Sequence, residues 1–360
     1  MIAVSRIFLI ALLLAVASPV FSQSNDGLPS APSVVNKPKP ASKPAPPTLP
    51  AAEQTPPQSA PAADLSDPRD SNDASPSSSD PNTIRVPVNE VNVVFTVTDK
   101  HNRYVKDLSK TDFKVLDDDR PVEEIRSFRR ETDLPLQVGL LIDASNSIRE
   151  RFKFEQESAI EFLNDTIRPR YDKAFVLGFD IAPELTQDFT DSSEKLSQGV
   201  RALQPGNATA MYDAVYYACR DKLLKSQQQT SVRRAIVLVS DGNDNASHVT
   251  REEAIEMALR ANTIIYTIST NFPSGGDSDK YDKVLERIAD ATGGRAFRPF
   301  QLTDVANAFA QIQDDLRSQY ALSYHPANLA HDGRYRTIAI SAVKKGLKVR
   351  SRTGYYAPGE

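Results

Sequence analysis

The chain has 360 residues, with 43 basic and 47 acidic side chains and a formal net charge of −4 at pH 7. This near balance excludes the generally basic surface of a nucleic-acid-binding protein. The single cysteine excludes a disulfide framework and a thiolate metal site, and four scattered histidines argue against a multi-histidine zinc centre. Between Phe21 and Phe95 there is no aromatic residue, and 14 of the 25 prolines fall between Pro29 and Pro81. It cannot build a core, so about 275 residues remain for one α/β domain and a smaller companion.

Residues 1–22 have the features of a secretory signal peptide. Arg6 is their only charged side chain, and the eleven residues from Ile7 to Ala17 are all apolar. This run is shorter than the about 20 apolar residues that span a bilayer. We expect cleavage after Ser22, export to the periplasm or the extracellular space, and no integral membrane segment in the mature chain. The alternative is an uncleaved N-terminal anchor.

Residues 23–84 combine Lys-Pro, Ala-Pro, Pro-Pro and Ser-Ser-Ser sequences. This composition is typical of a disordered, partly polyproline II linker. Its extended reach would approach ~190 Å at about 3.1 Å per residue. We expect either a spacer that holds the folded part away from a membrane or cell wall, or a tail without a specific role.

The folded part begins with strand patterns and no strand–helix–strand units. Residues 86–99 alternate and are rich in valine, which predicts a strand. Shorter strands are expected at 113–116 and 122–130, each after a turn. Residues 85–132 are therefore predicted to form the N-terminal part of a β-sandwich.

The pattern changes at residue 134. Residues 134–143 form a nearly continuous apolar strand, as expected when both faces of a sheet are covered. Strands then alternate with amphipathic helices, which predicts an α/β domain with a doubly wound, mainly parallel sheet over residues 133–319. The further strands are expected at 173–180, 234–239, 263–270 and 296–300, and the helices at 147–167, 193–203, 211–225, 250–262, 280–292 and 302–318.

After the last helix the chain returns to strands, at 320–326, 334–343 and 347–356. These three strands are too few to form a stable sheet without further partners. We therefore expect residues 320–360 to pair with the strands of residues 85–132. The α/β domain would then be inserted in a small β-sandwich formed by both flanks.

Oxygen-bearing side chains follow the predicted buried strands at the points where those strands end. Asp143, Ser145 and Ser147 come directly after the first buried strand. Asp241 follows a later one, and Thr209 lies in a loop before a helix. Ligands of α/β sheets bind beyond the carboxyl ends of the strands, so these groups are expected to meet. Two carboxylates and three hydroxyls suit a hard cation, Mg²⁺ or Mn²⁺, with one coordination position left for an outside carboxylate.

Three motifs carry these residues: DASNS at 143–147, GNAT at 206–209 followed by MYDAV, and SDG at 240–242. Their content and order resemble the von Willebrand factor A (VWA) domain and its metal-ion-dependent adhesion site (MIDAS). The resemblance implies a VWA fold in which the serines and the threonine bind the metal directly and the aspartates act through water. In that family the metal commonly binds an Asp or Glu of a partner protein, so the implied function is adhesion or protein binding.

The flanking segments extend the likeness beyond the domain. The sequence VVFTVTDKHNRYVKDLSKTDFKVLDDDRPVEEI precedes it, and YALSYHP and GLKVRSRTGYYAP follow it. Together they resemble the VWFA-related proteins of Acidobacteria, which carry a signal peptide and the same flanking strands.

Other interpretations stay open. The main alternative is a non-catalytic structural or assembly module that binds through the β-sandwich, with an inert VWA face. An enzyme is not expected, because GxSxG, HExxH and GxxxxGK[ST] motifs are absent from the sequence. His248, near Asp241, is the histidine best placed to act as a base. Residues 243–245 could hold a second ion, although a solvated turn is the simpler interpretation.

The segments around the predicted metal site are expected to decide which partner binds. Loops at 181–190, 205–212 and 243–250 would supply this selectivity. Asp213 is expected to order the loop that carries Thr209 and not to bind the ion itself.

Overall fold

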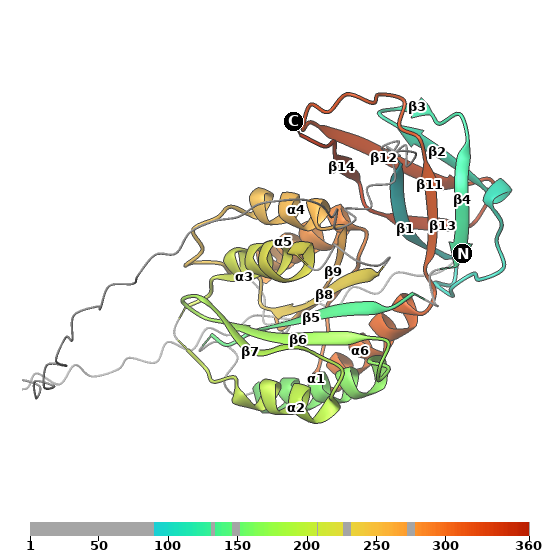
Figure 1. The fold of residues 1–360 in the computed structure, drawn as a ribbon. Helices are drawn as coiled ribbons and strands as arrows, with labels where there is room; N and C mark the ends of the chain where they lie inside the picture. The colour runs from blue at the N-terminus through green and yellow to red at the C-terminus, as the bar shows by residue number, and fades with distance from the viewer. Residues whose placement is uncertain are drawn as a thin grey trace, which may run out of the picture. The chain divides into compact units, whose positions relative to one another are not determined.

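The computed structural model describes residues 90–130, 134–145, 152–206, 208–225, 232–271 and 278–359 (Figure 1). The predicted signal peptide, the predicted linker and Ser147 lie outside the described residues. Across the described ranges, no helix combines the length and the apolar character that a bilayer crossing requires.

A six-stranded sheet forms the centre of the α/β part, in the order β10-β9-β8-β5-β6-β7. All neighbouring pairs are parallel except β6 and β7, which are antiparallel. The central strands β5 and β8 are apolar along almost their whole length because both of their faces are covered. The bounds are β5 (Leu136–Asp143), β6 (Lys173–Phe179), β7 (Pro183–Thr190), β8 (Arg233–Ser240), β9 (Thr263–Ser269) and β10 (Ala296–Phe297).

Helices cover both faces of this sheet (Figure 1). One face packs against α1 (Phe152–Thr166), α2 (Ser193–Ala202) and α6 (Leu302–Leu316). The other packs against α3 (Met211–Tyr217), α4 (Arg251–Arg260) and α5 (Ser278–Thr292), and α3 continues as a π-helical segment, Ala218–Leu224. The predicted α/β fold with a doubly wound, mainly parallel sheet is therefore confirmed.

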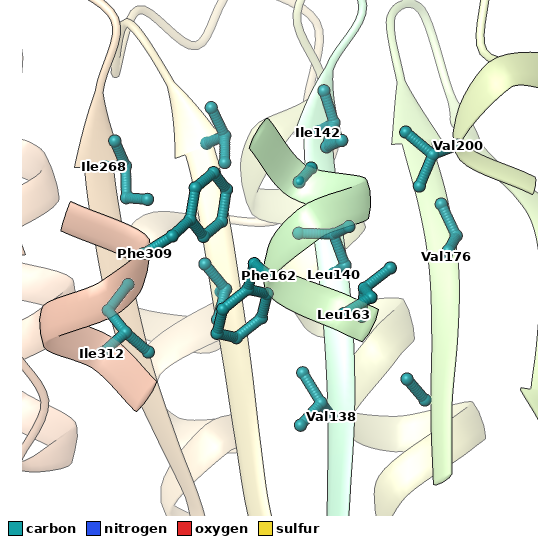
Figure 2. Packing of buried hydrophobic residues seen from close by; sticks show 14 of the residues in the cluster. Val138, Leu140, Ile142, Phe162, Leu163, Val176, Val200, Ile268, Phe309 and Ile312 are labelled. Carbon is teal, nitrogen blue, oxygen red and sulfur yellow. The ribbon is translucent and has the colours of Figure 1, made fainter. Parts of the chain in front are cut away.

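Each face has its own apolar core. On the α1 and α6 side, the rings of Phe162 and Phe309 stack with centroids 5.0 Å apart, and Leu140 of β5 belongs to the same core (Figure 2). On the other side, Cys219 is fully buried among the α3 and β6 side chains, and burial raises the pKa of its thiol. The cysteine therefore belongs to the core, as its helical spacing predicts.

The two flanks of the chain form two four-stranded antiparallel sheets, in the orders β13-β1-β11-β4 and β14-β12-β2-β3. The N-terminal β1 pairs with the C-terminal β11 and β13, which confirms the predicted pairing of the flanks. A 3-10 helix, Lys110–Asp112, precedes β2. The bounds are β1 (Val91–Thr98), β2 (Phe113–Asp117), β3 (Arg120–Pro121), β4 (Ile125–Arg130), β11 (Tyr320–Tyr324), β12 (Tyr335–Ala342), β13 (Lys348–Ser351) and β14 (Gly354–Tyr356).

The two antiparallel sheets share one apolar core. Phe95 of β1 packs edge-on against Phe113 of β2, with ring centroids 5.0 Å apart, and stacks on Tyr320 of β11 at 5.7 Å. Phe95 thus contacts a ring from its own sheet and a ring from the facing sheet, so the sheets form a β-sandwich.

Three predicted elements were wrong in detail. Residues 181–190 were expected as a loop, but most of them form the edge strand β7, whose polar, half-buried side chains hide the strand pattern. The expected strand 122–130 is shorter, because β4 begins only at Ile125, and the short strand β3 (Arg120–Pro121) lies in the segment before residue 122 where a turn was expected. The expected strand 347–356 is divided between β13 and β14. These two pieces, β13 and β14, pair in different sheets of the sandwich, so the chain must leave one sheet to reach the other.

A buried polar cluster joins the sandwich to the α/β part. Asp315 near the end of α6 is 1% exposed and accepts hydrogen bonds from Tyr266 of β9 at 2.9 Å and from Tyr104 at 3.0 Å. Arg350 of β13 forms an ion pair with the same carboxylate. Burial raises the pKa of Asp315, and the positive charge of Arg350 opposes this shift. The last helix of the α/β part is thus fixed to a strand of the sandwich.

Candidate functional site

Asp143 is the last residue of β5 and is fully buried at the carboxyl edge of the six-stranded sheet. Its Oδ1 accepts a hydrogen bond from the backbone amide of Ser145 at 2.9 Å. Its Oδ2 accepts one from the hydroxyl of Ser240, the last residue of β8, at 2.7 Å. Both carboxylate oxygens are therefore oriented by neighbouring groups, and each keeps further lone pairs for another ligand.

The electrostatics of Asp143 are those of a carboxylate removed from water. Burial raises its pKa to about 6, the hydrogen bonds from Ser240 and Ser145 oppose the rise, and the negative charge of Asp241 adds to it. Among the residues that the structure describes, no Lys or Arg forms an ion pair with Asp143. Within the described part of the chain, the edge therefore holds a buried negative charge that no Lys or Arg pairs with.

Asp241 follows β8 in a tightly fixed turn. Its Oδ1 accepts a hydrogen bond from the Asn243 amide at 2.9 Å, and its carbonyl accepts one from the Asn271 side chain at 2.8 Å. Gly242 has a φ of +79°, and a Cβ at that position would lie 2.5 Å from the carbonyl oxygen of Tyr281. Only glycine fits this turn without a shift of its neighbours.

Thr209 is buried in the loop before α3 and is held by the loop that follows β8. Its amide donates to Asn245 Oδ1 at 3.0 Å, and its carbonyl accepts from the amides of Asn245 at 3.0 Å and Ala246 at 3.2 Å. The next amide, that of Ala210, donates to the carbonyl of Asp180 after β6 at 2.7 Å. The Thr209 loop is thus attached to the ends of two strands.

A third attachment brings the same loop to the end of β5. The amide of Gly206 donates to the carbonyl of Ala144, and the amide of Ala144 donates to the carbonyl of Phe179 at 2.9 Å. Four of the five predicted ligands thereby lie at one edge of the sheet, and the fifth, Ser147, is outside the described residues. The four are Asp143, Ser145, Thr209 and Asp241.

The segment 243–250 is fastened to the first turn of α3 by side chains. Asp244 Oδ2 accepts from the Tyr212 amide at 2.9 Å and from the Ser247 hydroxyl at 2.6 Å. Asp213 Oδ1 accepts from the amides of His248 and Val249, each at 2.9 Å. Asp213 therefore orders this segment, which in turn holds Thr209, as expected.

Two other groups considered from the sequence have different contacts. Side-chain oxygens of Asp244 and Asn245 accept hydrogen bonds from backbone amides. These contacts fit a structural turn better than a second ion site. His248 Nδ1 lies 2.8 Å from Asp213 Oδ2 and not against a serine of the edge. This contact gives no support for a catalytic base.

Ser240 is the site residue that sequence reasoning missed. Its hydroxyl donates to Asp143 and accepts from the Gly242 amide at 3.1 Å, so it links the ends of β5 and β8. The available signal was a hydroxyl residue in the last position of a buried strand, directly before Asp-Gly.

The donor set fits a hard divalent cation. No group of three or more His, Cys, Asp or Glu side chains arranged for a metal occurs in the described ranges. The edge offers a different set, two carboxylates and hydroxyl oxygens, which suits Mg²⁺ or Mn²⁺. A cation there would balance the buried charge of Asp143.

Comparison with known proteins gives a family for this part of the chain. Residues 138–243 match the family model of the von Willebrand factor type A domain. Calcium-activated chloride channel regulator 1 of Bos taurus is 27% identical over 184 residues, which covers 49% of this chain and 19% of that protein's length.

Similar solved structures share low sequence identity with this chain. BatB from Bacteroides thetaiotaomicron has 14% identity and a TM-score of 0.40 and covers 50% of this chain and 99% of its own. The vWF domain of the type V pili tip protein Mfa5 from Porphyromonas gingivalis has 16% identity and a TM-score of 0.41, covering 50% and 94%. Proximal thread matrix protein 1 from the mussel byssus, with a zinc-occupied MIDAS motif, has 14% identity and a TM-score of 0.43, covering 54% and 48%. The family match over residues 138–243, together with the helix-covered six-stranded sheet, shows that this part of the chain has a von Willebrand factor type A-like α/β fold.

Proposed function

We propose that the carboxyl edge of the six-stranded sheet is a metal-ion-dependent adhesion site. Asp143, Ser145, Ser147, Thr209 and Asp241 would hold Mg²⁺ or Mn²⁺, and an Asp or Glu of a partner protein would complete the coordination. VWA domains are in general adhesion or protein-interaction modules, and the family match supports this function.

The observation that carries the proposal is the buried carboxylate of Asp143. A buried carboxylate without a counter-charge is costly, and a second carboxylate, Asp241, lies close enough to raise the pKa of the first. A divalent cation between them would convert this repulsion into attraction. The hydrogen bonds from Ser240 and Ser145 would hold Asp143 in one orientation before the ion arrives.

The same donor set explains why a partner's carboxylate is the proposed ligand. Neutral hydroxyls neutralise a cation less than carboxylates do, so the bound ion would keep affinity for an outside anion. The loops at 205–206 and 208–212 and at 243–250 flank this edge, and their side-chain attachments to α3 and to the strand ends would present a preformed surface.

The proposal extends to the whole chain through its sequence features. Residues 1–22 resemble a signal peptide, so we place the protein outside the cytoplasm, in the periplasm or the extracellular space. The likeness of the flanks to the VWFA-related proteins of Acidobacteria fits an exported protein. We propose a binding module and not an enzyme.

The first test is titration of the purified, EDTA-stripped protein with Mg²⁺ and Mn²⁺, followed by calorimetry and by melting temperature. Saturable binding should raise the melting temperature of the wild type, because a ligand that binds only the native state stabilises it. Asp143→Asn should weaken binding by about tenfold or more. Asp165→Asn, an exposed carboxylate on α1, removes the same charge and should bind as the wild type does.

Equal metal binding by the wild type and Asp143→Asn would contradict the proposed site. Absence of binding in the wild type would favour the alternative, a structural module that binds through the β-sandwich. The partner is tested next by selecting displayed random peptides on the Mg²⁺-loaded protein and eluting them with EDTA. Enriched peptides should share an Asp or Glu, and peptides that resist EDTA would contradict coordination by the partner.

A further inference from the structure

A cleft of about 340 Å³ lies between the end of α4 and the β-sandwich. Asn262, which lines it, directly precedes β9, so the cleft is at the amino ends of the parallel strands. The proposed metal site is at the carboxyl ends, marked by Asp143 and Asp241. The cleft has the size of pockets that take small ligands, and it is distinct from the metal site.

Arg352, between β13 and β14, lines this cleft together with the charged residues Glu90, Arg260 and Arg336. Its Nη1 donates to Asn262 Oδ1 at 3.0 Å and its Nη2 to the carbonyl of Asn92 at 2.8 Å, and both acceptors are neutral. Its Nε is buried and has no hydrogen-bond partner. Burial lowers the pKa of Arg352 to about 10, and among the described residues no carboxylate forms an ion pair with it. The Tyr355 ring lies 5.9 Å from its guanidinium carbon, so this desolvated guanidinium has an aromatic neighbour but no anion as its counter-charge.

The other two arginines of the cleft are compensated, which makes Arg352 the exception. Arg260 pairs with Glu256 at 2.8 Å, and Arg336 pairs with Asp332 at 3.3 Å. Neither Glu256 nor Asp332 lines the cleft. Three arginines and one carboxylate, Glu90, line it, so the lining carries a positive balance of charge. Removing a guanidinium from water is costly unless an anion accompanies it.

Apolar and aromatic groups form the remainder of the wall. The Tyr356 ring lies under Arg260, with the guanidinium carbon 4.5 Å from the ring centroid. Tyr355, Leu259 and Leu329 also line the cleft, and 57% of the surface of Leu329 is exposed. A ligand with an apolar body would find contacts here, in addition to the charged group.

We propose that this cleft binds a small organic oxyanion, a carboxylate or phosphate carried on an apolar or aromatic body, with Arg352 as the group that receives the anion. The anion would supply the counter-charge that Arg352 lacks, and the aromatic body would pack against Tyr356 and Leu329. Because the cleft contains no proposed metal ligand, binding here would not need a divalent cation.

The test is calorimetric titration of the purified protein in EDTA with benzoate, phenyl phosphate and benzyl alcohol. Benzoate or phenyl phosphate should bind saturably, and the stronger of the two identifies the preferred oxyanion. Benzyl alcohol, which has the same body without the charge, should bind about tenfold more weakly or not at all. Arg352→Gln removes the proposed receiving charge and should abolish anion binding.

A pair of surface variants keeps the test decisive if Arg352→Gln does not fold. Leu329→Asp places a negative charge at the cleft and should weaken benzoate binding by about tenfold. Val343→Asp makes a similar change at a residue that is 55% exposed and lies outside the cleft, and it should bind benzoate as the wild type does. No saturable binding of either anion would overturn the proposal. Equal binding of benzyl alcohol, equal binding by Leu329→Asp, or loss of binding in EDTA would overturn it as well.

Discussion

The hydroxyl of Ser240 lies 2.7 Å from Asp143 Oδ2 and donates a hydrogen bond to it across the neighbouring strands β5 and β8. The same oxygen accepts from the Gly242 amide at 3.1 Å. One serine thus positions the carboxylate at the end of one strand and the turn that carries Asp241 at the end of the other.

Ser240→Ala should weaken Mg²⁺ binding by about 10–100-fold, because the side chain that orients Asp143 is lost. It should also lower the free energy of unfolding by about 1–3 kcal/mol, since a buried acceptor loses its donor. Calorimetric titration and urea denaturation measure the two effects. Ser323→Ala removes a comparable buried serine, which contacts Ser127 at 2.7 Å in the sandwich, and should leave metal affinity unchanged. A loss of affinity in both variants would contradict a local role for Ser240.

Gly242→Ala should destabilise the protein more than Gly346→Ala. Both glycines have positive φ, +79° and +83°, so both substitutions carry the backbone strain of about 1 kcal/mol. Only at Gly242 would the new Cβ approach another atom, the carbonyl oxygen of Tyr281 at 2.5 Å, whereas nothing lies within 4 Å at Gly346. The extra cost is expected to be about 1–3 kcal/mol in urea denaturation. Equal destabilisation would show that the turn after β8 can move aside.

Asp172→Asn should reduce stability in a pH-dependent way. Burial raises the pKa of Asp172, but hydrogen bonds from Arg168 and from the Leu136 amide at 2.8 Å outweigh it, so the pKa is lowered on folding. A lowered carboxyl pKa contributes stability at neutral pH that is lost as the pH falls through the folded value. The wild type should exceed the variant by about 1–3 kcal/mol at pH 7, and the gap should shrink below about pH 4. A gap that is constant from neutral to acidic pH would contradict the ionic contribution.

Arg350→Met should cost about 3–5 kcal/mol, because it leaves the Asp315 carboxylate buried without its cation. Adding Asp315→Asn should recover part of that loss, since the uncompensated charge is then removed. Urea denaturation of both single variants and the double variant gives the coupling energy. Strictly additive losses would show that the pair contributes no coupling between α6 and β13.

More of the fold than of the site could be predicted from the sequence. The apolar runs of β5 and β8 identify buried central strands. The residues that follow these strands are expected at the carboxyl edge of the sheet whatever the order of its strands. β7 escaped prediction because an edge strand needs few apolar residues, and its sequence PELTQDFT reads as a polar loop. The switch between sheets at Arg352 and Thr353 was not predicted, because the strand pattern of residues 347–356 does not show that β13 and β14 will join different sheets.

Contacts between segments that are distant in the sequence limit how well the two sites can be predicted. Nothing near Arg352 in the sequence indicates that Asn262 and Asn92 will receive its hydrogen bonds, so the cleft is visible only after folding. Likewise, the role of Ser240 depends on which strand lies beside β8, not on its own neighbours in the chain. Metal ligation by the five predicted residues stays a prediction.

The pairing of β1 also has a consequence for the order of folding. Phe95 lies opposite Tyr320 on one side and Ser351 on the other, so both neighbours of this early strand are synthesised near the end of the described chain. During synthesis, the α/β part can complete its own sheet while both edges of β1, a strand rich in apolar side chains, are still unpaired. The sandwich therefore cannot close before β11 and β13 have been synthesised, and until then both edges of β1 are open to mispairing with another chain.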